Sequence, residues 1–196
     1  VTCSAPVSYE VPVTFTRNEV HVSEPIVFTK EVVMEAAVCV LDSTMSVSAS
    51  SATFRGAEVK GKGSLKFASS SGVLTLHRSA ITIPLVVERL TPGNRRTSEL
   101  TTVYLCGSQL GSLTLGSGTA VHAALNCTAN TTYSNTMTDA TFATGSYLIL
   151  DGVSSASQPL LLGSLFEGSE YAVEVNSLEP QASLSVEVAV YLSATC

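Results

Sequence analysis

The three histidines, His21, His77 and His122, are the residues of this chain best suited to acid–base chemistry or to metal binding. Each lies in a strand-like alternating run, and none has a cysteine or another histidine at a metal-ligand spacing. The sequence also lacks a nucleophile elbow, a zinc-binding helix motif and a phosphate-binding loop. We therefore expect no catalytic residue, no metal and no cofactor, and we predict that the chain is not an enzyme.

The five cysteines, Cys3, Cys39, Cys106, Cys127 and Cys196, do not form a C-x-x-C pair, and an odd number leaves at least one thiol or an intermolecular bridge. If the protein is exported, Cys3 with Cys39 and Cys106 with Cys127 are the pairs we expect. In a reducing cytosol all five would serve as small hydrophobic residues. The sequence leaves both compartments open.

Two N-glycosylation sequons begin at Asn126 and Asn130. Such triplets arise readily by chance in a chain rich in serine and threonine. They become glycan sites only if the protein passes through a secretory pathway.

The basic residues are confined to the first half of the chain, because no lysine or arginine follows Arg96. Strand alternation places Lys60, Lys62 and Lys66 on one polar face, and Arg95 lies beside Arg96 at a Pro-Gly turn. The net charge is −6, and neither aromatic interleaving nor a basic tail supports nucleic-acid binding. The first interpretation of the three lysines is a solvated strand face. The alternative is that all five residues form a basic contact face for the acidic half of a neighbouring copy. Any contact with nucleic acid through residues 55–96 would be weak.

The composition is apolar and poor in charge, with 45% hydrophobic and 13% charged residues. Such a surface is expected either to be buried against other subunits or to be the serine- and threonine-rich coat of a secreted domain.

No apolar run approaches the ~20 residues of a spanning helix, so we expect no membrane anchor. A chain that starts at Val1 without methionine suggests processing.

Period-two alternation of apolar and polar residues dominates the sequence and predicts an all-β protein. The segment 7–15 reads as an edge strand because Pro12 cannot donate to a ladder. No internal repeat is evident. The alternating pattern is interrupted most clearly at Leu90–Ser98. Further strands are predicted at 20–28, 31–41, 45–54, 57–67, 72–77, 80–88, 100–106, 110–115, 119–126, 140–150, 158–166, 169–176 and 184–192.

We predict an antiparallel β-sandwich, with a single jelly roll over 1–196 and an extended N-terminal part of about 1–30 as the first choice. The alternative is two immunoglobulin-like sandwiches over 1–89 and 99–196.

Two resemblances carry the functional expectations. The segment His77–Val87, the turn at Leu90-Thr-Pro92 and the run Leu100–Leu105 resemble a strand pair of the jelly-roll coat proteins of small plant RNA viruses, tymoviruses especially. The pair 171–175 and 184–192 fits the same layout. This resemblance implies a capsid subunit without an enzymatic site.

The second resemblance is to chaperone–usher pilins. Val27–Val33, continuing through Ala36-Ala37 to Cys39, resembles the region around the first cysteine of a pilin. It implies that the alternating segment Val7–Phe15 is a donor strand that completes the sheet of a neighbouring subunit. Lys30 departs from this family's pattern, which usually has glycine there, and Cys106 lies farther along than its disulfide expects.

The predicted function is a structural subunit that assembles with copies of itself or related subunits into a shell, located in a virion. The alternative is a pilin-like subunit of an extracellular fibre. A second alternative is a glycan-binding or immunoglobulin-like adhesion module at the cell surface, for which the sequence names no receptor or glycan.

Overall fold

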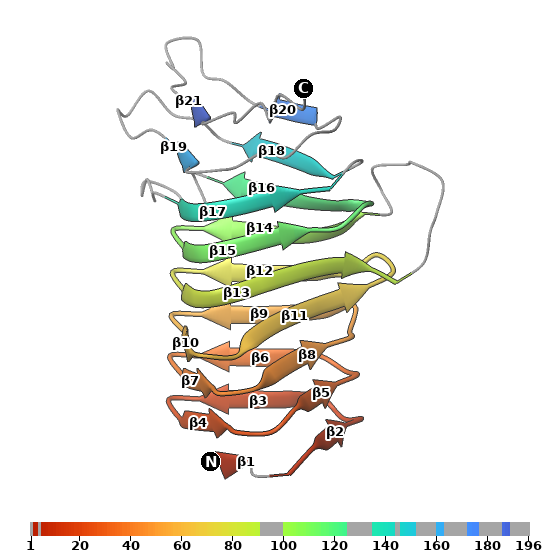
Figure 1. The fold of residues 1–196 in the computed structure, drawn as a ribbon, viewed down its shortest axis with the longest axis vertical. Coiled ribbons are helices and arrows are strands. Elements are labelled where there is room, and N and C mark those ends of the chain that lie inside the picture. Colours follow the sequence, from red (N-terminus) through yellow and green to blue (C-terminus); the bar gives the residue numbers. More distant parts are fainter. Residues whose placement is uncertain are drawn as a thin grey trace, which may run out of the picture.

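The computed structural model shows an all-β chain wound into a parallel β-solenoid of about five turns (Figure 1). It describes residues 2–3, 5–90, 100–124, 135–143, 146–151, 160–162, 172–176 and 186–188. Adjacent strands come from successive coils and run in the same direction. Each coil therefore pairs with the coil before it and the coil after it.

The strands form two sheets. The first sheet contains β1 (Thr2–Cys3), β2 (Val7–Tyr9), β4 (Glu19–Val22), β5 (Ile26–Phe28), β7 (Val38–Leu41), β8 (Thr44–Val47), β10 (Glu58–Gly61), β11 (Ser64–Ser69), β13 (Ala80–Arg89), β15 (Gln109–Leu115), β17 (Thr136–Phe142), β19 (Leu160–Leu162) and β21 (Val186–Val188). The second sheet contains β3 (Val13–Thr16), β6 (Val32–Glu35), β9 (Ser51–Arg55), β12 (Val73–His77), β14 (Thr101–Cys106), β16 (Thr119–Ala124), β18 (Tyr147–Asp151) and β20 (Ala172–Asn176).

The coils are of two kinds, and β13 marks the change between them. The three-strand coils, residues 13–69, each contribute one strand to the second sheet and two strands to the first. From β12 onward each coil contributes one strand to each sheet, and residues 73–142 are called the two-strand coils below. The ten-residue strand β13 joins the two kinds because it pairs with β10 near its start and with β11 near its end.

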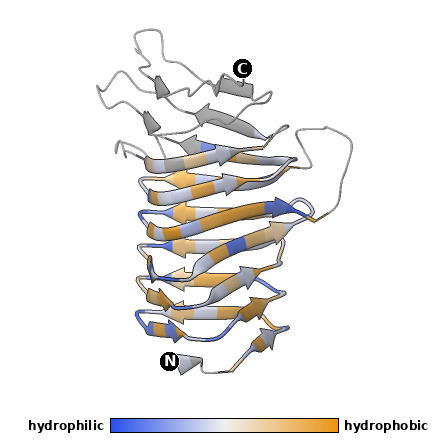
Figure 2. Cartoon of the chain, viewed as in Figure 1, coloured by the Kyte–Doolittle hydropathy of each residue, from blue (hydrophilic) through white to orange (hydrophobic). Residues whose placement is uncertain are grey.

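The core is a set of apolar columns that run along the solenoid. One column passes through Ile26, Met45, Leu65, Leu85 and Leu113, each of which is no more than 1% exposed. Hydrophobic and hydrophilic residues alternate along the strands in Figure 2, as expected when one face of each strand is buried. Burying a side chain of this size contributes roughly 1.5–3 kcal/mol, so the stacked columns are the main source of cohesion.

The ladder registers reveal a repeat that the sequence analysis missed. Val13 pairs with Val32, and Val32 pairs with Ala52, so these two coils differ in length by a single residue. The repeated feature is a pair of inward apolar residues separated by one outward residue, as in Ile26 with Phe28. Because the residue types vary from coil to coil, the pattern repeats while the letters do not.

The antiparallel β-sandwich prediction is wrong, and so are the single jelly roll and the alternative of two immunoglobulin-like sandwiches. Period-two alternation identifies which side chains face the core, but it carries no information about strand direction. The suggested boundary between 1–89 and 99–196 does not separate two sheets, because β12 pairs directly with β14 across it. The strands that suggested a viral coat protein do not pair with each other, because β13 and β21 lie in the first sheet and β14 and β20 lie in the second.

Candidate functional site at the solenoid corner

One corner of the solenoid repeats the same backbone conformation in successive coils. The residue that turns the chain from the second sheet into the first has a positive φ between 49° and 61°. These residues are Arg17, Ala36, Gly56, Arg78 and Gly107. The Gly56 amide donates to the His77 carbonyl and the Arg78 amide donates to the Cys106 carbonyl, both at 2.8 Å. Non-glycine residues therefore tolerate the left-handed turn where the neighbouring coil satisfies the backbone.

From Ala36 onward the residue after the turn is buried, whereas Asn18, which follows Arg17, is exposed. In the two-strand coils this buried residue is polar. Ser79, Ser108 and Asn135 are at most 2% exposed. The Ala57 amide donates to Ser79 Oγ at 3.1 Å, the Ser79 amide to Ser108 Oγ at 3.2 Å, and the Ser108 amide to Asn135 Oδ1 at 2.9 Å. We call these three side chains the polar ladder. It links successive coils through side-chain acceptors for buried amides.

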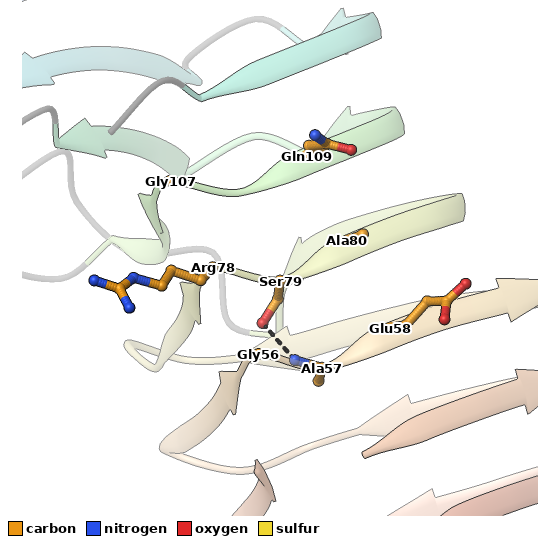
Figure 3. Close-up of a pocket in the computed structure, with 8 residues that line it drawn as sticks. All are labelled: Gly56, Ala57, Glu58, Arg78, Ser79, Ala80, Gly107 and Gln109. Atoms are coloured by element: carbon orange, nitrogen blue, oxygen red, sulfur yellow. Dashed lines mark hydrogen bonds between the residues drawn. The ribbon is translucent and has the colours of Figure 1, made fainter. Parts of the chain in front are cut away.

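A shallow groove of about 360 Å³ lies outside this corner (Figure 3). In the figure the Ser79 side chain points toward the Ala57 amide, whereas the Arg78 side chain extends away from Glu58. The glycines of the lining have no side chains to fill the space. The lining residues are Gly56, Ala57, Glu58, Arg78, Ser79, Ala80, Gly107 and Gln109.

Ser79 is the only hydroxyl among the residues that line the groove, and its geometry does not suit nucleophilic catalysis. Its Oγ accepts from Ala57 and lies 3.0 Å from the Phe54 carbonyl and 3.1 Å from the His77 carbonyl, either of which it can donate to. A serine nucleophile needs a base to take its proton, and here carbonyl oxygens receive that donor. The ladder is therefore built to stabilise the backbone.

The lining of the groove carries one charge of each sign, Arg78 and Glu58. Burial lowers the pKa of His77 from its ordinary value of 6.5, and the nearby guanidinium groups of Arg78 and Arg55 lower it further. Arg55 also faces Glu35 at 3.6 Å, a long ion pair between exposed side chains. Burial and the two guanidinium groups therefore favour the neutral form of His77.

The predicted basic contact face is only partly described. Lys60 pairs with Glu58 at 3.1 Å and Lys66 pairs with Glu88 at 2.7 Å, while Lys62 is exposed at the bend between β10 and β11. Arg95 and Arg96 lie outside the described residues. Two of the three lysines thus have acidic neighbours in their own chain.

The cysteines are placed as follows. Cys39 is a thiol at 0% exposure in the core column between Val20 and Val59. Cys3 is two ladder steps away and two residues off register, roughly 12 Å at about 4.8 Å per step, which is too far for a disulfide. The Cys3–Cys39 pair is therefore not formed here.

Cys106 is disulfide-bonded. Its expected partner Cys127 lies outside the described residues, as do Cys196 and the sequon residues Asn126 and Asn130. The predicted pairing of Cys106 with Cys127 stays a prediction.

The other two histidines, His21 and His122, do not belong to a cluster of metal-binding side chains in the described part of the chain. His21 is exposed and lies 3.0 Å from Glu19, and His122 packs edge-on against Tyr104 with ring centroids 5.0 Å apart. Among the described residues no three His, Cys, Asp or Glu side chains gather closely enough to hold a metal ion.

The segment proposed as a donor strand, Val7–Phe15, instead forms β2 and β3, which pair with β5 and β6 of the same chain.

The polar ladder was not predicted from the sequence, although a signal for it exists. In the first two of the two-strand coils a serine follows an inward leucine by three positions, Leu76 to Ser79 and Leu105 to Ser108. The matching positions in the earlier coils are Ala37 and Ala57. Aligning the coils by their apolar pairs would have revealed this column.

In the described part of the chain no helix has the length and apolar character needed to cross a bilayer. No protein-family model matches the chain, and neither the curated proteins nor the solved structures contain a significant match to it.

Proposed function

We propose that this chain is a non-enzymatic structural rod, the solenoid segment of an exported surface protein that holds other parts at a distance and offers its long faces for contact. The observation that carries the proposal is the continuous apolar interior of a parallel solenoid. Solenoids stack repeats in one dimension and present extended surfaces, which suits a stalk or an adhesive face.

The interior supports a mechanical role over a catalytic one. The apolar columns pass from coil to coil, and the polar side chains that enter the interior at the corner bond to the backbone. Close-packed interiors of this kind are stiff and transmit force along the packed direction. The groove at the corner is shallow, and its single hydroxyl is engaged with carbonyl oxygens.

The chemistry of the chain supports export. Disulfides persist in oxidising compartments, and Cys106 is disulfide-bonded. A surface coated with serine and threonine and only 13% charged residues also suits an extracellular stalk. The shell-forming role depended on a jelly-roll arrangement, and the parallel coils remove that basis, so we do not carry it forward.

The test is the location and redox state of the native protein. An antibody raised against the folded chain should label intact source cells without permeabilisation. A mass measurement of the native protein without reducing agent should show the loss of two hydrogens for each disulfide. Labelling that appears only after permeabilisation, together with a fully reduced mass, would overturn the proposal.

A further inference from the structure

The corner groove is a depression on the outward face of three neighbouring strands. The ladder registers place Glu58 of β10, Ala80 of β13 and Gln109 of β15 side by side, and Figure 3 shows Glu58 and Gln109 on the strands either side of Ala80. At about 4.8 Å per ladder step, the Cα atoms of Glu58 and Gln109 lie roughly 10 Å apart, with only the Ala80 methyl group between their side chains. The described row continues to Val38 and Thr136, so Ala80 is its smallest side chain.

Two glycines extend this depression toward the corner. Gly56 and Gly107 occupy the left-handed position on the coils next to that of Arg78. A Cβ atom at Gly56 would have no neighbour within 4 Å, so this side of the groove is open to solvent. A volume of about 360 Å³ is in the range of sites for one small ligand, or for one unit of a longer ligand.

The lining offers hydrogen-bonding groups of every kind and no apolar side chain larger than alanine. The Arg78 guanidinium donates, the Glu58 carboxylate accepts, and the Gln109 side-chain amide does both. Glu58 Oε1 already accepts from Lys60 at 3.1 Å, and a carboxylate has further acceptor sites. The lining has one charge of each sign, so it favours a neutral ligand. Each hydroxyl of a sugar ring both donates and accepts, so such a ring matches these groups.

The backbone beneath the groove is already paired, which argues against an added peptide strand. The Ala80 amide donates to the Ala57 carbonyl and the Gln109 amide donates to the Ser79 carbonyl, each at 2.9 Å. β13 pairs with β10 on one side and with β15 on the other. A peptide that extends a sheet needs an open edge, and the strands that form the groove lie inside the sheet. A ligand here must therefore be recognised by side chains.

We propose that the corner groove binds one neutral pyranose unit of a glycan, with the ring over Ala80 and its hydroxyls bonded to Glu58 and Gln109. Arg78 is a further donor at the corner end of the groove. The groove is shallow and its lining has no aromatic ring for stacking, so a single unit should bind with a Kd of about 1 mM or weaker. Several copies of the chain on one surface would hold a repeating glycan more tightly through simultaneous contacts. The proposal does not rest on the structural role proposed above, because binding is measured on the isolated chain.

NMR titration of the nitrogen-labelled chain provides the first test. The probes are the methyl glycosides of glucose, galactose, mannose and N-acetylglucosamine, and triglycine is the comparison probe for a peptide. At least one glycoside should shift the Ala80 and Gly107 amides and the Gln109 side-chain amide in a saturable way. The proposal would be overturned if no glycoside produced a saturable shift, or if none bound more tightly than triglycine.

Two variants provide the second test. Gln109→Ala removes a hydrogen-bonding group from the exposed edge of the groove and should weaken binding of that glycoside roughly tenfold. Ala80→Ile fills the depression with a residue suited to a strand and should abolish the shifts. Thr114→Ala is the matched control, because Thr114 is an exposed residue of the same strand as Gln109 and lies outside the groove. If Gln109→Ala bound the glycoside as tightly as Thr114→Ala, the proposal would be overturned, whether or not Ala80→Ile folds.

Discussion

The three-strand coils and the two-strand coils use the same corner in different ways. In the second and third of the three-strand coils the residue after the left-handed turn is a buried alanine, Ala37 and Ala57. In the two-strand coils the buried corner residue is polar: Ser79, Ser108 and Asn135. The three-strand coils are nearly equal in length, because the steps from β3 to β6 and from β6 to β9 differ by a single residue. From β9 onward the coils are unequal, and the step from β12 to β14 is much longer than the step from β14 to β16.

The difference shows how each region holds its register. Where coil length is constant, apolar packing and the backbone ladder place each coil on the one below it. Where coil length varies, side-chain bonds to the neighbouring backbone fix the corner, because a slip by one residue would leave buried amides unsatisfied. The three-strand coils have a different constraint, at the bend between β10 and β11, where the backbone of one coil lies close to the backbone of the next.

The largest effect is expected from Gly61→Ala at this bend. Gly61 has φ +124°, and a Cβ atom there would lie 2.2 Å from the Leu41 carbonyl oxygen. The backbone of the two coils would have to separate, so we expect a loss of about 4 kcal/mol in the free energy of unfolding. Chemical denaturation monitored by circular dichroism measures this loss.

Gly56→Ala is the control for that variant. Gly56 also has a positive φ, +57°, but no atom lies within 4 Å of its Cβ position, and Ala36 occupies the same corner position one coil earlier. We expect a loss of about 1 kcal/mol from backbone strain alone. Equal losses for the two glycines would show that close approach between coils does not constrain the bend.

The next effect is expected from Ser108→Ala in the polar ladder. Ser108 Oγ accepts from the Ser79 amide at 3.2 Å and lies 3.0 Å from the Leu76 carbonyl, all in the buried interior. Removing the hydroxyl leaves that amide without its acceptor, which costs about 2 kcal/mol. The same denaturation measurement applies, with Thr114→Ala on the exposed face of β15 as a control expected to change stability by less than about 0.5 kcal/mol. A loss at Ser108 as small as that of the control would remove the assigned role of the ladder.

The smallest effect concerns His77 at the first corner of the two-strand coils. Because its pKa is lowered from 6.5 in the folded chain, the unfolded chain binds more protons between the two pKa values. The His77 contribution is therefore fully present above pH 6.5, is lost as pH falls from 6.5 toward the folded pKa, and changes no further below it.

NMR titration of the His77 ring tests this expectation. Arg78→Gln should raise the pKa of His77 only part of the way toward its ordinary value, because burial is the larger cause of the shift. An unchanged pKa in this variant would show that Arg78 does not act on His77.

Much of the local structure could be predicted from the sequence, and the architecture could not. The runs 72–77, 80–88 and 100–106 match β12, β13 and β14 closely, because alternation is visible along each strand. The run 57–67 splits at Gly61 and Gly63, where Cβ atoms would meet carbonyl oxygens of the coil below. That contact is made with a different coil, so the residues next to Gly61 and Gly63 in the sequence do not predict it.

The corner between the second sheet and the first was not predicted from the sequence, for a related reason. Arg78 was not expected to adopt a left-handed conformation, because arginine rarely does so without support from a neighbour. Ser79 lies between the predicted strands 72–77 and 80–88, and no role was predicted for it because its partners include backbone groups of another coil. Strand direction, coil length and the polar ladder are all properties of how coils stack. They become readable from sequence only after the coils are aligned with one another.

The nearest-neighbour pairing of the coils has a consequence for how the chain can fold. Each coil closes one loop onto the coil before it, and these loops differ less than twofold in length, so the entropy lost at each closure is modest and similar each time. Because each coil pairs with the coil before it, coils can be added one at a time in the order in which they occur along the chain. A chain that emerges N-terminus first from an export pore would gain a folded coil for each such stretch released. Each newly folded coil would prevent the chain from sliding back into the pore. Folding itself would therefore act as a ratchet for translocation.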